Sequence, residues 1–477
     1  LNMPLILPGN VATATASTGY NVANSCRFND DDSAYLSRTQ TSGSTTKFTY
    51  SAWMKRNKLG SAQDFLDVYD DNNNRFGFFW SDDDQIDMYN KISGSVNFQK
   101  ITTARYRDIS AWYNVIIAAD TTLATAEDRI KLWVNGVRVT SFGTNTNPGS
   151  SDNLSIHSSD DTQKIGAYGT SGSDYDGYMA EVVWIDGTTY ANTDFGEFDE
   201  DSPTIWKPKD VSGLTFGSNG FHLDFEDSSA LGNDVSGENN DFSVTNLAAT
   251  DQTTDTCTNN FATLNPLVPI NNSTFSEGNC KVVTGSSEYS YDVSTIGVSA
   301  GKWYVEAKYG GSSDDATFGI AGRTATDTTH ELGHYNDTWS YYTGTGASNV
   351  RNNNSNSSYG NTYAADDIIG LALDLTNNKL YFSKNGTWQN SGDPTSGSTG
   401  TGAISITAAS GVTDGVYYIG IGDFDGGASV TWEINFGTPS FSISSGNADD
   451  NGYGNFEYDV PAGYLALCTK NLGSDGG

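Results

Sequence analysis

Residues 330–334 carry the arrangement with the clearest chemical potential in this sequence. They read HELGH, which matches the H-E-x-x-H pattern of zinc proteases letter for letter. On an α-helix, two histidines four residues apart lie on one face and can share a zinc ion, and the glutamate can act as a general base. That chemistry requires a helix of about ten residues or more around the motif.

The flanking sequence argues against such a helix. TATDTT precedes the motif and YNDTWSYYTGTG follows it, and both are rich in β-branched and turn-forming residues. Gly333 inside the motif costs a helix about 1 kcal/mol relative to alanine. A metzincin extension would need glycine and histidine where the chain has Asp337 and Ser340. A third ligand would have to come from His157, His222 or an acid, and no pattern selects one. We therefore expect a loop without zinc.

A second near-match is GEFDEDSP at residues 196–203. Laminarinase-type glycosidases carry E-x-D-x-x-E on a strand, so that alternate acids face one cleft. Glu197 and Asp199 fit this pattern, but Ser202 stands where the acid/base glutamate belongs. The sequence also lacks a G-x-S-x-G elbow and a Walker loop. We predict no enzymatic activity.

The elements that would position these residues are predicted to be strands. KFTYSAWMKR (47–56), AWYNVIIAAD (111–120) and RIKLWVNGVRVTSF (129–142) are β-branched and aromatic segments separated by turn residues. The third contains an Asn-Gly hairpin signal, and KLYFSKNGTWQ (379–389) repeats it much later. No long stripe with helical period interrupts the pattern. The sequence predicts an all-β fold of two antiparallel β-sandwiches, or jelly rolls, in tandem.

The length and composition support two domains. The chain has 477 residues, more than one hydrophobic core usually serves. NLAATDQTTDTCTNN around residue 250 is polar and Thr-rich and lacks alternation, which is typical of a linker. We expect a first domain over residues 1–247, a linker over 248–260 and a second domain over 261–477.

The order of these motifs resembles known modules. The first half contains, in order, RFNDDDSAYLSRT, FTYSAWMKR, AWYNVIIAADT, IKLWVNGVRV and DGYMAEVVWIDG, which resemble laminin-G-like, concanavalin-like jelly rolls. The second half contains GKWYVEAKYGG, ATFGIAGR, DDIIGLALDLTNNKLYFSKNG, YYIGIGDF, WEINFG and PAGYLALCTKNL, which resemble a SPRY domain. The combination, with LNMPLILP and NNFATLNPL, resembles virion structural proteins of marine tailed bacteriophages. This resemblance implies a tail fibre, tailspike or head decoration protein, commonly a homo-oligomer such as a trimer.

Charge restricts the partners and the metals. Twenty-five basic and 58 acidic residues give a net charge of −33, which disfavours nucleic acid and anionic membrane surfaces. No apolar run reaches the roughly 20 residues of a membrane span, and the first residues lack the features of a signal peptide. DVYDDNNNRF (67–76) and SDDDQID (81–87) could supply oxygen ligands to Ca²⁺, with Asp70 and Asp71 as the first choices. Solvated turn acids are the alternative, and no cofactor is required.

The four cysteines, Cys26, Cys257, Cys280 and Cys468, form no C-x-x-C pair. We expect free thiols, with Cys257–Cys280 as the one pair that merits suspicion.

Aromatic residues near loop ends are the candidates for ligand binding. Sugar rings stack on Trp and Tyr while neighbouring acids and amides bind their hydroxyls. On this basis the sequence nominates Trp80, Trp339, Tyr341, Trp388 and Asp423, although aromatic residues of a sandwich more often fill its core. We expect a non-enzymatic protein on the surface of a virion that binds a host-surface glycan or receptor. A decoration protein that contacts only other virion proteins is the first alternative, and a polysaccharide depolymerase is the second.

Overall fold

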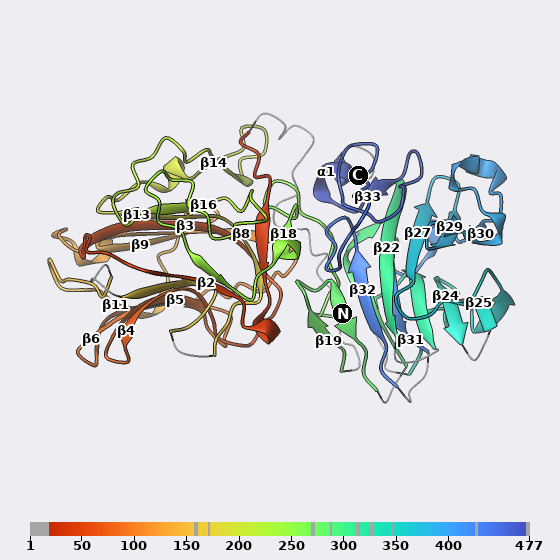
Figure 1. Ribbon diagram of the computed structural model, residues 1–477, viewed down its shortest axis with the longest axis horizontal. Helices are drawn as coiled ribbons and strands as arrows, with labels where there is room; N and C mark the ends of the chain where they lie inside the picture. The colour runs from red at the N-terminus through yellow and green to blue at the C-terminus, as the bar shows by residue number, and fades with distance from the viewer. Residues whose placement is uncertain are drawn as a thin grey trace. The chain divides into compact units, whose positions relative to one another are not determined.

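The computed structural model describes residues 19–473 except 157–160, 170–171, 269–271, 287–288, 312–314, 325–328, 345–346 and 425–427. The chain divides into two compact units, Leu1–Asn260 and Phe261–Gly477. Both consist of sheets that are antiparallel except for the parallel pair β22 and β33 in unit 2 (Figure 1), which confirms the all-β prediction. Within the described residues, the helical elements are α1 (Thr469–Asn471) and short 3₁₀ turns at Asp30–Asp32, Ala126–Asp128, Asn192–Asp194, Ala249–Asp251, Gln389–Ser391, Pro394–Thr399 and Ala409–Gly411.

Unit 1 is a sandwich of two eight-stranded sheets. In the first sheet β13 lies at the centre, between β3 on one side and both β1 and β16 on the other. This sheet runs β10 (Val137–Arg138), β9 (Ile130–Val134), β8 (Trp112–Asp120), β3 (Lys47–Arg56), β13 (Gly177–Asp186), β1 (Ser25–Phe28) and β18 (Gln252–Thr253), with β16 (Phe221–Leu223) beside β13.

The second sheet of unit 1 is a meander over most of its width. Strands β4 to β7 follow one another in sequence and in space, because short turns join them. The sheet runs β11 (Phe142–Thr146), β7 (Ser95–Thr102), β6 (Ile86–Ile92), β5 (Asn74–Trp80), β4 (Gln63–Asp71), β12 (Thr162–Ile165), β2 (Tyr35–Thr39) and β17 (Ser243–Thr245).

An aromatic core joins the two sheets of unit 1. Phe48 on β3 stacks on Trp184 of β13, with ring centroids 4.5 Å apart, and meets Phe76 of β5 edge-on at 5.3 Å. All three side chains are fully buried. Alternation along each strand places these residues inward, as the sequence pattern predicts.

The outer face of the β3–β13 sheet is covered by a long segment that follows β13. In Figure 1 this segment, with β14 (Gly196–Phe198), lies over the sheet. Trp206 of β15 (Trp206–Pro208) is buried there beside Gly136 and Gly196, where a Cβ on either glycine would clash with the indole. The sheet therefore has apolar side chains on both faces.

Residues 248–260 differ from the expected linker. Strand β18 pairs with β1, and Asp255 accepts a hydrogen bond from Lys55 Nζ at 2.8 Å with both side chains fully buried. Trp112 Nε1 also donates to Asp255, at 3.1 Å. The polar residues that suggested a linker include the hydrogen-bond and ion-pair partner of a buried lysine. The segment therefore belongs to unit 1.

Unit 2 is a second sandwich, with a nine-stranded sheet facing a six-stranded one. The larger sheet runs β19 (Thr274–Ser276), β20 (Lys281–Val283), β32 (Thr431–Asn435), β22 (Lys302–Gly311), β27 (Ile368–Asp374), β28 (Lys379–Lys384) and β29 (Thr387–Trp388), with β30 (Ile404–Ser405) beside β28 and β33 (Leu465–Ala466) beside β22. The smaller runs β21 (Ser290–Val298), β31 (Tyr417–Asp423), β23 (Ala316–Ala321), β24 (Thr338–Gly344), β25 (Ala347–Asn352) and β26 (Ser355–Ser358).

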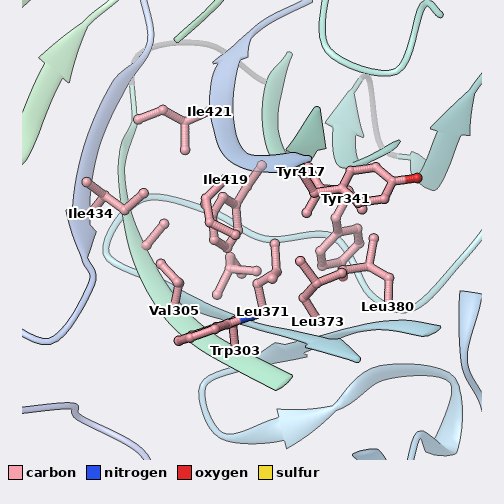
Figure 2. Packing of buried hydrophobic residues seen from close by; sticks show 14 of the residues in the cluster. Trp303, Val305, Tyr341, Leu371, Leu373, Leu380, Tyr417, Ile419, Ile421 and Ile434 are labelled. Carbon is pink, nitrogen blue, oxygen red and sulfur yellow. The ribbon is translucent and has the colours of Figure 1, made fainter. Parts of the chain in front are cut away.

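Figure 2 shows the core between these sheets. Trp303 and Leu371 of the larger sheet face Ile419 and Tyr341 of the smaller one. The four cysteines of the chain are buried thiols outside any disulfide, as expected. No helix in the part of the chain that the structure describes is long and apolar enough to cross a membrane.

Replacing Asp255 by alanine tests whether residues 248–260 belong to unit 1. The change leaves the Lys55 ammonium buried without its carboxylate, so we expect the free energy of unfolding to fall by about 3–5 kcal/mol in urea denaturation. The matched control is Lys47→Ala, which removes a pair with Asp120 in which the lysine is 38% exposed, and should cost less than about 1 kcal/mol. Equal effects of the two substitutions would mean that the segment acts as a linker.

Candidate functional site

The outer face of the β4–β7 sheet in unit 1 carries polar and aromatic side chains in neighbouring rows. Paired residues on neighbouring strands share a face, so the strand register places Asp64, Phe79 and Asp87 in one row. Asp67 and Tyr89 flank Gly77 in the next row. We call this group the outer-face site.

A bulge in β4 brings its two acids onto the same face. Asp64 and Asp67 are three residues apart and would point to opposite faces of a regular strand. The register shifts between Asp64 and Leu66, so Phe65 is an extra residue and both Phe65 and Leu66 point into the core. The shift places the two carboxylates together on the outer face.

Arg75 of β5 joins the two carboxylates. Its Nε donates to Asp67 Oδ1 at 2.7 Å, and a terminal nitrogen donates to Asp64 Oδ1 at 3.3 Å. The ring of Tyr168 covers the guanidinium, with its centroid 3.3 Å from Cζ. Asp67 is fully buried, and Arg75 and a backbone hydrogen bond from Gly169 favour its charged form.

The environment raises the pKa of these acids above the usual range. Burial raises the pKa of Asp67 to about 6, although Arg75 opposes the shift. Burial also raises the pKa of Asp87 to about 6, against the Gln99 amide, which donates to both of its oxygens at 3.0 and 3.2 Å. Burial and repulsion by Asp67 raise the pKa of Asp64 well above its usual value.

Aromatic rings border the acids. Phe79 and Tyr89 are half-buried and meet edge to face, with centroids 5.9 Å apart. A Cβ at Gly77 would lie 3.1 Å from the Tyr89 ring and 3.2 Å from Asp67, so only glycine permits this packing without displacing them. Half-exposed rings beside a carboxylate and a carboxamide can stack on a sugar and bind its hydroxyls.

Trp80, which the sequence nominated, is in the core of unit 1. Its side chain is fully buried and lies near Phe65 and Tyr106. Because side chains alternate, the strand that turns Trp80 inward turns Phe79 outward. The nominated position is therefore one residue away from the aromatic side chain that lies on the surface.

Three of the four residues nominated in unit 2 are also buried. Trp339 is 5% exposed, while Tyr341 and Asp423 are fully buried in the sandwich (Figure 2 shows Tyr341). Asp423 accepts a hydrogen bond from the Thr284 hydroxyl at 3.3 Å. Trp388 is half-buried beside Tyr381, so it alone of the five keeps part of its ring on the surface.

The acids nominated for calcium have local partners. Asp71 Oδ1 accepts hydrogen bonds from the backbone N–H groups of Asn73 and Asn74 at 2.6 and 2.8 Å, and so caps the β4–β5 turn. Asp70 is exposed. Among the described residues, no three His, Cys, Asp or Glu side chains are grouped to hold a metal ion.

The HELGH segment is a turn between β23 and β24, as the flanking sequence predicts. Gly333 has φ +99, which no helix contains. The rings of His330 and His334 lie against each other, with centroids 3.8 Å apart. Leu332 is buried, and Ser340 Oγ donates to its carbonyl at 2.8 Å. His157, the other histidine considered as a ligand, lies outside the described residues.

Glu331 of this turn is an anchor for Arg351. Its Oε1 accepts from Arg351 Nε at 2.7 Å and lies 2.6 Å from a second guanidinium nitrogen, with both side chains buried. A carboxylate committed to this ion pair is poorly placed to act as a general base. In the GEFDEDSP segment, Asp199 has a similar role, because it accepts from the backbone N–H groups of Asp201 and Ser202, both at 3.0 Å.

Sequence reasoning missed Asp64, Phe79, Tyr89 and Gln99 as members of a site. Asp67 and Asp87 lie within the acidic stretches that it considered for calcium. Part of the signal was present, because Arg75 is the one charged residue of β5, which otherwise is mostly aromatic. The bulge that groups Asp64 with Asp67 leaves no mark in the sequence.

Comparisons with known proteins agree with the two units. Residues 28–191 match Laminin_G_3, described as the concanavalin A-like lectin/glucanases superfamily, and residues 302–408 match the SPRY domain. The chain thus contains a concanavalin-like domain followed by a SPRY domain. No curated protein matches the sequence.

Among solved structures, the SPRY domain of human HERC1 is 16% identical, with a TM-score of 0.27, over 34% of this chain and 91% of that one. A SAP-like pentraxin from Limulus polyphemus is 14% identical, with a TM-score of 0.27, over 35% and 78%. Stonustoxin is 17% identical, with a TM-score of 0.27, over 36% and 27%.

Replacing Asp87 by asparagine should stabilise the protein only at higher pH. The native carboxyl titrates near pH 6 and the unfolded one near 4, so the native state holds more protons between these values. The wild type therefore loses stability as pH rises through this window, and asparagine does not. Urea unfolding should show a gain of about 1–2 kcal/mol at pH 8 and none at pH 4. The exposed control Asp70→Asn should change stability little; a gain for Asp87→Asn that is independent of pH would contradict the assignment.

Two substitutions separate the anchoring role of the HELGH turn from zinc chemistry. Glu331→Ala leaves the buried Arg351 without its carboxylate and should lower the free energy of unfolding by about 2–3 kcal/mol. His330→Ala should change it little, because this ring is half-buried at the surface. Elemental mass spectrometry of the purified protein should find no stoichiometric zinc. One zinc per chain that disappears in His330→Ala would overturn this view of the turn.

Proposed function

We propose that this chain, with its concanavalin-like and SPRY units, is a non-enzymatic surface protein of a tailed-bacteriophage particle. Its concanavalin-like unit binds a glycan of the host surface through the outer-face site. The observation that carries the proposal is the row in which the half-exposed Phe79 lies between Asp64 and Asp87, beside Tyr89. The position on the particle, at the tail or the head, is left open.

The chemistry of the site suits a polyhydroxylated ligand. Phe79 and Tyr89 offer ring faces and edges to the apolar side of a sugar. Asp87 and Gln99 offer an acceptor and a donor within hydrogen-bonding distance of each other.

Support for a place on a phage particle comes from the sequence. The order of motifs across both units resembles virion structural proteins of marine tailed bacteriophages. Two domains of kinds found in binding proteins, with a net charge of −33, fit an exposed role in a saline medium that screens self-repulsion. Homo-oligomers, including trimers, are expected from the same resemblance.

A decoration protein that contacts only other proteins of the particle is the alternative. One patch of unit 1 favours it, because Val137 and Phe198 are 61% and 40% exposed. Phe198 meets the buried Trp206 edge to face, and Gly136, which precedes Val137, lies against the same indole. Exposed aromatic and aliphatic side chains on a polar surface are typical of protein contacts.

A panel of immobilised glycans tests the proposal. We expect the purified protein to bind a host-surface polysaccharide, and Phe79→Ala and Tyr89→Ala each to weaken binding about tenfold, which corresponds to about 1.4 kcal/mol. Phe198→Ala is the matched control, since it removes an exposed aromatic ring of the same unit outside the site. No release of reducing ends should accompany binding, and their release would support a depolymerase.

The same variants test the place on the particle. Mass spectrometry of purified particles should detect the protein, and its absence would refute a virion role. If Phe198→Ala abolishes incorporation into particles while no glycan binds, the decoration protein is the correct alternative.

A further inference from the structure

We infer that the glycan bound at the outer-face site carries a positively charged amine. This inference rests on the proposed function and specifies its ligand. It starts from an imbalance of charge among the side chains that meet on this face.

Four carboxylates and three cations meet on this face. Asp64 is repelled by Asp67, Asp174 and Asp87 and attracted by Arg75. Lys164 lies on β12 opposite Asp67, and Lys91 lies on β6 opposite Arg75. Counted by formal charge, four acids and three bases leave the group one positive charge short. A cation brought by a ligand reduces the mutual repulsion of the acids.

The three cations are already engaged, which disfavours an acidic ligand. Arg75 binds Asp67 and Asp64 and lies under Tyr168. Lys164 Nζ donates to the carbonyl of Gly169 at 2.8 Å, and Lys91 Nζ donates to the carbonyl of Asn72 at 2.6 Å. A uronate or a sulfated sugar would meet repelling carboxylates, with each cation already bonded within the protein.

The aromatic rings of the site suit the same ligand. Phe79 and Tyr89 are half-buried next to Asp87, so an ammonium group there could contact a ring face and a carboxylate together. Cations placed over aromatic faces gain about 0.5–2 kcal/mol. Asp87 is 5% exposed, and its carboxylate accepts a hydrogen bond from Gln99. Asp87 therefore lies at the boundary between the buried acids and solvent.

An amine fits the site better than a metal ion does. A divalent cation takes several oxygen ligands at short range. Among the residues that the structure describes, no three acids or histidines are arranged in that way. An ammonium group needs fewer partners and gains from neighbouring charge at longer range.

Titration calorimetry with three matched oligosaccharides tests the inference. The probes are a glucosamine hexamer, its N-acetylated counterpart and a uronic acid hexamer, each at pH 6.5 in 20 and 200 mM salt. We expect the amine hexamer to bind at least tenfold more tightly than the N-acetylated one, and to lose much of this advantage at 200 mM salt. The uronic acid hexamer should not bind.

Asp87→Asn should abolish the preference for the amine, while the control Asp70→Asn, an exposed acid at the end of the same β4 strand, should keep it. Near-UV circular dichroism verifies that both variants are folded.

Equal or tighter binding of the N-acetylated or uronic acid hexamer, lost in Tyr89→Ala, would overturn the inference and leave the proposed function intact. Stoichiometric calcium that Asp87→Asn removes would overturn it in favour of a metal. If none of the three hexamers binds but another glycan does so through Tyr89, the inference fails alone; if no glycan binds, both fail.

Discussion

The ion triad of Arg75 with Asp64 and Asp67 is the interaction on which the outer face of unit 1 depends. Each of the three side chains is at most 6% exposed. Burying any one of these charges without its partner would cost several kcal/mol of desolvation. Burial raises the pKa of both acids, with added repulsion from Asp67 at Asp64, and the single guanidinium of Arg75 opposes both shifts. The triad therefore fixes the geometry of the face while it retains unsatisfied charge, which a structural ion pair would avoid.

Packed side chains cover outer faces of the other sheets, and this distinguishes them from the outer face of β4–β7. In unit 1, the segment after β13 buries Trp206 against the β3–β13 sheet. In unit 2, Phe456 and Tyr464 pack on the outer side of β22 and β28, and Leu332 of the HELGH turn packs on the outer side of the smaller sheet. The outer face of β4–β7 instead has half-exposed rings over buried acids. Its strands belong to a tightly hydrogen-bonded meander, so the side chains on it are held by a rigid framework.

The sequence was sufficient to predict the architecture, because the two sandwiches depend on period-two alternation and on Asn-Gly hairpins. Asn135 and Asn385 both adopt positive φ, as such hairpins require. It was also sufficient to reject HELGH, since the flanks lack helix-forming residues. The site was harder to predict, because a shift of one residue along a strand decides whether a side chain faces the core or the surface. Trp80 was nominated, but Phe79 is the ring that faces outward. One bulged residue, Phe65, groups Asp64 with Asp67, and no local pattern announces it. Residues 248–260 were predicted to be a linker because they are polar and lack alternation. Their polar side chains bond to residues far away in the sequence, such as Lys55, and a local pattern cannot reveal such partners.

Hydroxyl-radical footprinting, with mass spectrometry of the oxidised side chains, tests the central claim most directly. The protein is labelled alone and with the oligosaccharide that binds most tightly in the glycan panel. The account predicts that oxidation of Phe79, Tyr89 and Tyr168 falls on binding, while Phe198 and Trp388 are oxidised as before. Unchanged oxidation of the first three residues, with protection of Trp388 or Phe198, would show that the glycan binds elsewhere and would contradict the account.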